Sequence, residues 1–145
     1  MPNHCDQTVT ISGPPKLILA LERAVEQGNF LQTVIPMPFE KYNDWYEWCT
    51  KHWGTKWDIC NPVIIDRSWD GDSQLWWATA DQDEHAFFVF QCWTAWTPPV
   101  PVWEKLVNMG FSVKASYIDE GGFFQGTYKD GVIDEISEEF LTEAG

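Results

Sequence analysis

The cysteine and histidine side chains best placed for chemistry are Cys49 and His52, three residues apart in a segment that favours a helix. This spacing puts both on one helix face, where they could act as a nucleophile and its base. Cys60, with His4 or Cys5, could complete the four ligands of a zinc site. However, the chain has no CxxC or HExxH pair, no GxSxG motif and no glycine-rich phosphate-binding loop. We therefore expect no metal and no cofactor, and an enzyme that uses Cys49 and His52 is an alternative hypothesis.

Tryptophan is the most unusual feature of the composition, with ten in 145 residues. Four of them lie within residues 45–57 and three within residues 93–103. Tryptophan is enriched at the energetic centres of protein interfaces because it combines a large rigid surface with one hydrogen-bond donor. Trp48 lies off the helical stripe that the other aromatic residues of its segment form, so we expect it to be exposed. We expect Trp96 to be a second exposed anchor for a partner.

The same rings could instead form a pocket for a small ligand. Lys56 lies between Trp53 and Trp57, where it could stack on an indole or bind an anion. Aromatic rings with one cation could hold a nucleobase by stacking and a phosphate by charge. A small-ligand or nucleotide-binding protein is therefore a second alternative. For most individual tryptophans, packing in the core is the simplest explanation.

The chain is strongly acidic, with 22 Asp and Glu against 9 Lys and Arg and a net charge of −13. Residues 1–65 carry a net charge of −2, and residues 66–145 carry −11. This charge disfavours direct binding to nucleic acids and to anionic membranes, and it favours a partner with a basic surface. The carboxylates that we expect to face solvent in turns and to steer this partner are Asp81, Asp83, Glu84, Asp119 and Glu120.

Hydrophobic spacing predicts the elements that carry these side chains. Alternation places Cys5, Gln7, Val9 and Ile11 on one face of the first strand. Prolines precede the first and third helices, and the apolar residues at helical spacing in the first are Leu17, Ile18, Leu21, Ala24 and Val25. The predicted strands cover residues 4–11, 30–35, 63–65, 75–80, 86–93, 111–117 and 123–128, and a turn at residues 129–131 can close another hairpin. The predicted helices cover residues 14–27, 42–53 and 100–107. Residues 137–145 are expected to form a short acidic helix or tail.

The order of these elements predicts one α+β domain over residues 1–145. We expect a ferredoxin-like antiparallel sheet covered by helices on one face, with an inserted aromatic-rich helix and an extra hairpin. No apolar run is long enough to span a bilayer, and the first residues lack the pattern of a secretory signal. The expected location is therefore the cytoplasm.

Several segments together resemble the Api-like family of small phage and plasmid proteins, which are described as carrying a ferredoxin-like domain. The resemblance extends to about residue 128, and its most specific part is Trp-Gly-Thr-Lys-Trp at residues 53–57. The other segments that carry it are Met1–His4, Ile11–Gly13, Pro36–Pro38, Trp45–Trp48, Thr94–Pro99 and Tyr117–Phe123 with Gly126. The resemblance implies a protein of a mobile element that acts in the cytoplasm of a bacterial host. It implies no reaction and no catalytic residue.

The leading hypothesis is a non-enzymatic binding protein that inhibits a basic, nucleic-acid-handling defence factor of the host by occupying its surface. A CRISPR complex and a restriction enzyme are examples of such a factor, which makes the protein of anti-CRISPR or anti-restriction type. In this hypothesis the carboxylates speed the encounter, and the exposed tryptophans provide the lasting affinity. We expect no direct contact with nucleic acid or membrane.

Overall fold

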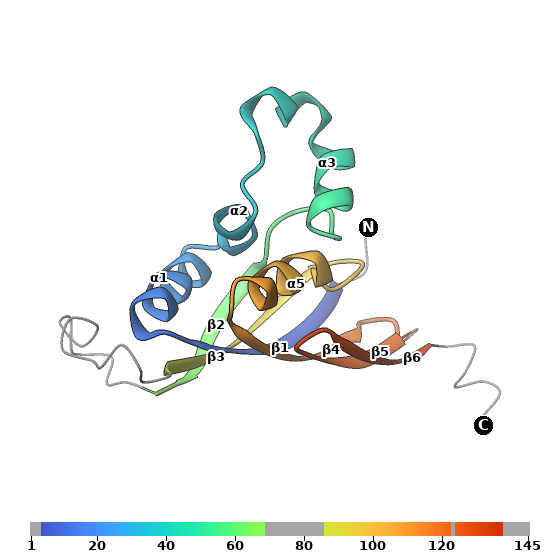
Figure 1. Ribbon diagram of the computed structural model, residues 1–145. Coiled ribbons are helices and arrows are strands. Elements are labelled where there is room, and N and C mark those ends of the chain that lie inside the picture. Colours follow the sequence, from blue (N-terminus) through green and yellow to red (C-terminus); the bar gives the residue numbers. More distant parts are fainter. Residues whose placement is uncertain (1–3, 69–85, 123, 138–145) are drawn as a thin grey trace.

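The computed structural model describes residues 4–68, 86–122 and 124–137, which form a six-stranded sheet with helices (Figure 1). All neighbouring strands are antiparallel, and their order is β2-β3-β1-β4-β5-β6. The strands are β1 (His4–Gly13), β2 (Cys60–Arg67), β3 (Ala86–Ala95), β4 (Ser112–Asp119), β5 (Phe124–Lys129) and β6 (Val132–Ser137). The predicted α+β class with an antiparallel sheet is therefore confirmed.

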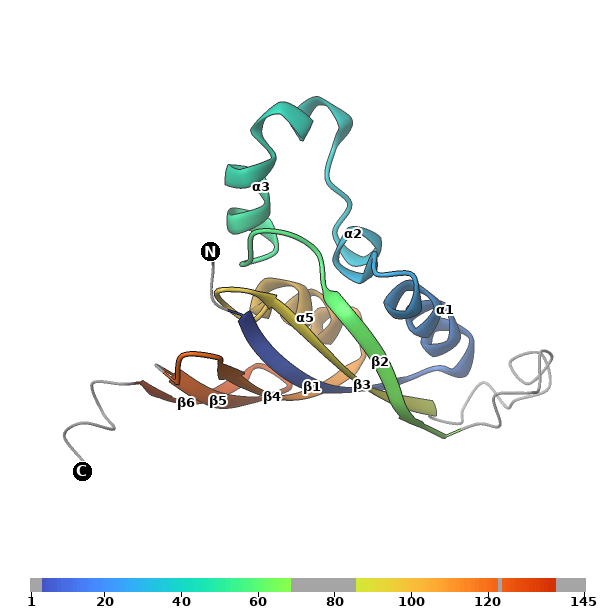
Figure 2. The same ribbon diagram turned by 180° about the vertical axis from the view of Figure 1, so that it is seen from behind.

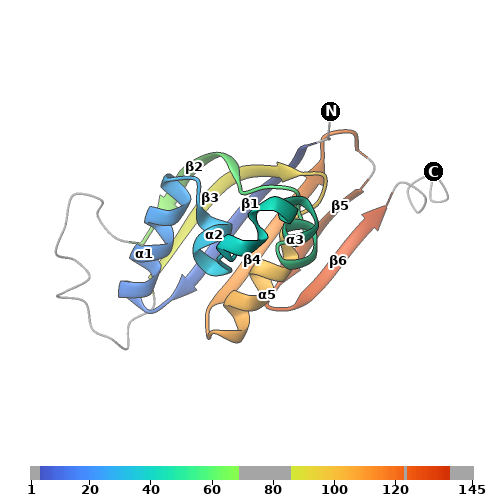
Figure 3. The ribbon, with the colours of Figure 1, turned by 90° about the horizontal axis from the view of Figure 1, so that it is seen from above.

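The described helices lie on one face of the sheet, the covered face, and leave the other face of the described strands open (Figures 1 and 2). They are α1 (Pro15–Glu26), α2 (Phe30–Val34), the 3-10 helix η1 (Phe39–Asp44), α3 (Trp45–His52) and α5 (Val100–Asn108). Helix α1 lies over β3, and α5 lies over β4 (Figure 3). None of these helices combines the length and the apolar character that a membrane crossing needs.

Strand β1 is central, and its alternation divides the two faces of the sheet as the sequence predicts. Cys5, Gln7, Val9 and Ile11 are buried on the covered face. The residues between them are half-buried or exposed on the open face. Because side chains alternate along a strand, this one register decides which residues of β3 and β4 share each face.

The core lies between the covered face of the sheet and helices α1, α2 and α5. Its largest fully buried side chains include Trp103 of α5, Tyr128 of β5 and the pair Phe88 and Phe90 of β3. Helices α1 and α5 both begin with proline in the first turn, as predicted for segments that follow an extended break. Leu17, assigned to the buried side of α1 by its spacing, is instead 49% exposed.

Residues 30–35 form helix α2 rather than the predicted strand. The carboxylate of Asp58 accepts hydrogen bonds from the backbone N–H groups of Leu31 (2.9 Å) and Gln32 (3.0 Å). These N–H groups have no partner inside a helix, so a carboxylate from a distant part of the chain stabilises this short one. The strand prediction used only the pattern of apolar residues within this segment, and that pattern contains no sign of a contact with Asp58.

Two other predictions fall partly or wholly outside the described residues. The strand predicted at residues 75–80 lies outside them, as does all of the predicted acidic helix or tail after Ser137, which is the last residue of β6.

The extra hairpin is present as β5 and β6. Its two-residue turn has positive φ at Asp130 (48°) and Gly131 (101°), as tight hairpins of this type require.

Candidate functional site

Residues 36–53, which we call the arm, leave the helix layer and stand away from the sheet (Figures 1 and 2). The indole rings on the inner side of the arm are buried and belong to the hydrophobic core. The indole of Trp48 stacks on the ring of His52, with centroids 4.5 Å apart, and meets Trp53 edge-to-face at 5.4 Å. Trp53 donates a hydrogen bond from Nε1 to the carbonyl of Ile35 at 2.8 Å. These contacts fix the arm to the chain segment that leaves α2.

Trp48 is therefore not the exposed anchor that the sequence predicts, because it is only 8% exposed. The rings assigned to the buried stripe, Trp45 and Tyr46, are instead 42% and 44% exposed. The prediction assumed that residues 42–53 form one continuous helix. The segment is instead divided between η1 and α3, and it projects from the fold, so its outer rings meet solvent.

Two loops meet below the arm: residues 54–59, before β2, and residues 96–99, between β3 and α5. Side-chain hydrogen bonds hold them together. Thr55 donates from Oγ1 to the carbonyl of Ala95 at 2.7 Å, and Thr97 donates from Oγ1 to the carbonyl of Gly54. Gly54 has φ of +76°, and a Cβ atom there would lie 2.7 Å from Cδ of Pro101. Only glycine fits this position without strain. Because the close approach at Gly54 and the two hydrogen bonds fix the loops together, we call this pair of loops the platform.

Trp96 stands on this platform with a backbone φ of 69°. Positive φ is a genuine outlier for a bulky residue and costs on the order of 1–3 kcal/mol. The indole is nevertheless 37% exposed, and it meets the ring of Tyr46 edge-to-face with centroids 6.2 Å apart. Burial of the ring therefore does not explain the strained backbone. Strain of this kind is typical of functional positions.

The ammonium group of Lys56 is the centre of this surface. Its Nζ lies 5.0 Å from the ring centroid of Trp57, 5.2 Å from that of Trp96 and 5.8 Å from that of Tyr46. These distances are within the range of cation–π attraction. No salt bridge to Lys56 is formed within the described part of the chain. We call these four residues the Lys56 cluster.

The cluster combines residues that the sequence assigned to two different hypotheses. Trp96 was expected to anchor a protein partner, and Lys56 and Trp57 were expected to line a ligand pocket. The structure places these three together and adds Tyr46, which sequence reasoning missed because its spacing resembled that of core residues. Trp53, the third expected pocket residue, is 4% exposed and belongs to the hydrophobic core.

The expected acidic residues have different environments. Asp119 is 3% exposed at the end of β4, where its carboxylate accepts a hydrogen bond from the N–H of Gly121, so the expectation that it faces solvent is wrong. Glu120 is exposed, as expected, and accepts a hydrogen bond from the N–H of His4 at 2.9 Å. Asp81, Asp83 and Glu84 lie outside the described residues.

The possible nucleophile and base, Cys49 and His52, are not joined by a hydrogen bond among the described contacts. Burial, with a smaller contribution from the charge of Asp58, raises the pKa of the Cys49 thiol, which disfavours the reactive thiolate. His52 instead directs Nδ1 to the carbonyl of Trp48 at 3.0 Å. Among the described residues, no three Cys, His, Asp or Glu side chains gather to hold a metal ion.

Comparisons with family models, with curated proteins and with solved structures each gave no match to this chain. The resemblance to the Api-like family stays a prediction from the sequence.

Proposed function

We propose that this protein is a non-enzymatic binding protein that docks on another protein through the Lys56 cluster and the exposed rings of the arm. The observation that carries the proposal is Trp96, a half-exposed indole fixed on a strained backbone by a hydrogen-bonded platform. Rigid, partly exposed aromatic rings bind a partner with little loss of side-chain entropy. They are typical of the residues that contribute most to affinity.

The arm carries further exposed rings. Trp45, whose ring centroid lies 6.0 Å from that of Tyr46, is 42% exposed, and Phe39 at the start of η1 is 83% exposed. Residues 36–57 contain three acidic and three basic side chains, so this region carries no net charge of its own. Aromatic rings are enriched in the central part of protein interfaces, so a surface with these rings and no net charge is suited to contact with a protein.

The acidic excess of the chain supports a basic partner. Residues 69–85 and 138–145 contain eight acidic residues and no Lys or Arg. Their charge complements a surface that binds nucleic acid, and it would accelerate association without adding much to the final affinity. We propose that the partner is a nucleic-acid-handling defence factor of a host, whose basic surface the protein occupies in an anti-CRISPR or anti-restriction role.

We further propose that strands β1 to β4 with α1 and α5 form a ferredoxin-like core. Two features support this: the order strand, helix, strand, strand, helix, strand along these elements, and their arrangement β2-β3-β1-β4 in the sheet. The arm is then an insertion, and β5 and β6 are an added hairpin. The Api-like resemblance, with its bacterial host cytoplasm, belongs to the same proposal.

A small anionic ligand is a second candidate function, because Lys56 has no salt bridge among the described residues and is surrounded by rings. The small-ligand function is less well supported, because the rings that would stack on a ligand already interact with the ammonium group of Lys56. Native mass spectrometry of the gently purified chain distinguishes the two. A bound nucleotide that disappears in Lys56→Ala and Trp57→Ala would favour the small ligand.

The main proposal is tested by affinity capture from bacterial lysates, followed by binding measurements with the purified captured protein. Trp96→Ala and Tyr46→Ala should each weaken binding roughly tenfold or more, as for truncated interface hot spots. Leu17→Ala is the matched control, because it removes an apolar side chain that is 49% exposed on α1, outside the cluster. Equal binding by all variants would refute docking through the cluster.

The charge contribution has a separate test. The association rate should fall from low to high salt, and charge reversal at Asp81, Asp83 and Glu84 should slow association. A rate that responds to neither change would remove the electrostatic part of the proposal while leaving the aromatic part intact.

A further inference from the structure

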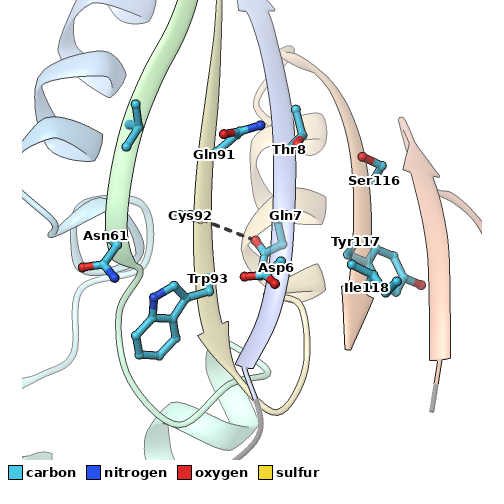
Figure 4. A pocket seen from close by; sticks show the side chains of 11 residues that line it. Asp6, Gln7, Thr8, Asn61, Gln91, Cys92, Trp93, Ser116, Tyr117 and Ile118 are labelled. Carbon is cyan, nitrogen blue, oxygen red and sulfur yellow. Dashed lines mark hydrogen bonds between the residues drawn. The ribbon is translucent and has the colours of Figure 1, made fainter. Parts of the chain in front are cut away.

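A groove of about 440 Å³ crosses β2, β3, β1 and β4 on the open face of the sheet, opposite to the helices (Figure 4). Polar but uncharged side chains line much of it, including Asn61 of β2, Gln91 of β3, Thr8 of β1 and Ser116 of β4. Asp6 is the only charged residue among the described residues that line it. The groove therefore has one fixed negative charge and many possible hydrogen-bond partners.

Asp6 lies between two apolar side chains that the sheet register places beside it. It is paired with Trp93 on β3 and with Ile118 on β4, and Figure 4 shows it between them. Asp6 is exposed, and within the described part of the chain its carboxylate makes no hydrogen bond and no ion pair. This carboxylate is available to a cation that enters the groove.

The indole beside Asp6 is held in place by its own neighbours. Trp93 stacks on the ring of His4, with centroids 3.6 Å apart and an angle of 11° between the planes. His4 is fixed in turn by Glu120, which accepts a hydrogen bond from its backbone N–H and lies 3.7 Å from its Nδ1. Glu120 thus positions the ring stack at the end of the groove.

We infer that this groove binds the side chain of an arginine on the partner protein. A guanidinium group is planar, donates two parallel hydrogen bonds to a carboxylate and stacks on aromatic rings. Asp6 offers the carboxylate, while Trp93 and Ile118 offer apolar surface on either side. Lysine carries the same charge but has neither the flat faces nor the paired donors, so the groove should prefer arginine.

This inference rests on the proposed function in one respect, because it assumes a basic protein partner. Single-stranded RNA is a different class of partner that could stack a base on an open sheet face. The only charge in the described lining is negative, and the chain as a whole carries −13, so both repel a phosphate backbone. The charges therefore favour an arginine-bearing protein over RNA.

The test uses the full chain labelled with ¹⁵N and three probes: a tri-arginine peptide, a tri-lysine peptide and a uridine oligomer. Titration followed by NMR should shift the indole N–H of Trp93 and the backbone amides of Asp6 and Ile118 first. The arginine peptide should bind more tightly than the lysine peptide of equal charge. Asp6→Asn, which keeps the size of the exposed side chain, should weaken arginine binding about fivefold.

Glu104→Gln is the control, because Glu104 is exposed on α5 and its loss changes the net charge by the same amount. Weakening by Asp6→Asn alone supports the inference. Equal weakening by both variants, or shifts spread over all acidic parts of the surface, would mean unspecific attraction and overturn it. Tighter binding of the uridine oligomer in the groove would overturn it in favour of RNA.

The two proposals fail in different ways. If arginine peptides ignore the groove while partner capture still depends on Trp96, only the groove is refuted. If arginine peptides bind at Asp6 while capture does not depend on Trp96, the docking proposal for the Lys56 cluster is refuted and the groove remains.

Discussion

Two groups of aromatic rings in this protein have similar composition and opposite surroundings. Trp103 of α5 is fully buried, and its ring lies 5.2 Å from that of Tyr128 and 6.3 Å from that of Tyr117. Trp96 of the Lys56 cluster is 37% exposed and contacts Tyr46 and Lys56. The first group is carried by a helix and two strands, whereas the second is carried largely by loops and the projecting arm.

The difference shows what holds each group in place. Regular secondary structure positions the buried rings, and their removal from water stabilises the fold. The exposed rings depend on Gly54, on hydroxyl-to-carbonyl hydrogen bonds and on a strained backbone at Trp96. The fold thus gains its stability from one group, and it supports the other group at a cost, which is the pattern expected of a binding surface.

The largest effect is expected from Trp103→Ala. Removing a fully buried indole should lower the free energy of unfolding by about 3–5 kcal/mol, because it leaves a cavity under α5. Urea denaturation measures this loss. Trp96→Ala should cost far less. Comparable losses for the two variants would contradict the division between a stabilising and a binding group of rings.

Gly54→Ala should have the next largest effect, about 2–3 kcal/mol, because it combines a positive φ with overpacking against Pro101. Gly28→Ala is the matched control: Gly28 has φ of +75°, and its Cβ would meet nothing within 4 Å. The control should cost only about 1 kcal/mol, the backbone penalty alone. Only Gly54→Ala should also impair partner binding, since it separates the loops that carry Lys56 and Trp96. Equal losses of stability in both variants would mean that the close approach to Pro101 has no consequence.

A smaller effect separates strain from contact at Trp96. Glycine tolerates the φ of 69° and alanine does not, so Trp96→Gly should be more stable than Trp96→Ala by about 1 kcal/mol. Both variants lack the indole and should lose partner binding equally. Thermal or urea unfolding of the pair gives the difference. If the alanine variant is as stable as the glycine variant, the backbone at this position is not strained.

The sequence predicts the buried group of rings much better than the exposed one. Alternation identified the covered face of β1 through Cys5, Gln7, Val9 and Ile11, and proline with helical spacing located α1 and α5. These signals are local, since each depends on the period of one element. They do not depend on how distant segments meet.

The failures share the opposite property. Residues 30–35 form a helix because Asp58, more than twenty residues away, binds its first N–H groups. Trp48 is buried because the arm turns it towards Trp53, and Asp119 is buried where β4 ends. The Lys56 cluster joins positions 46, 56 and 96 through loop contacts that no local pattern contains.

The smallest predicted effect concerns a charge that is buried between α1 and the sheet, in contrast to the half-buried charge of Lys56. Glu22 of α1 is 3% exposed and faces Arg67 of β2, with Oε1 3.0 Å from Nη2. Burial raises the pKa of Glu22, and the attraction of Arg67 only partly offsets it. The folded state therefore holds this proton more tightly than the unfolded chain does.

The sign of the pH dependence follows from this difference in proton binding. As pH rises from the ordinary carboxyl pKa through the raised one, the folded state holds more protons than the unfolded state, so this group lowers the free energy of unfolding. Glu22→Gln removes the group, and a plot of unfolding free energy against pH should become flatter or rise in that interval. Glu104→Gln, which removes an exposed carboxylate on a different helix, α5, should keep the wild-type slope. An unchanged slope in Glu22→Gln would show that the ion pair with Arg67 fully offsets the effect of burial on this carboxyl, which would contradict the prediction.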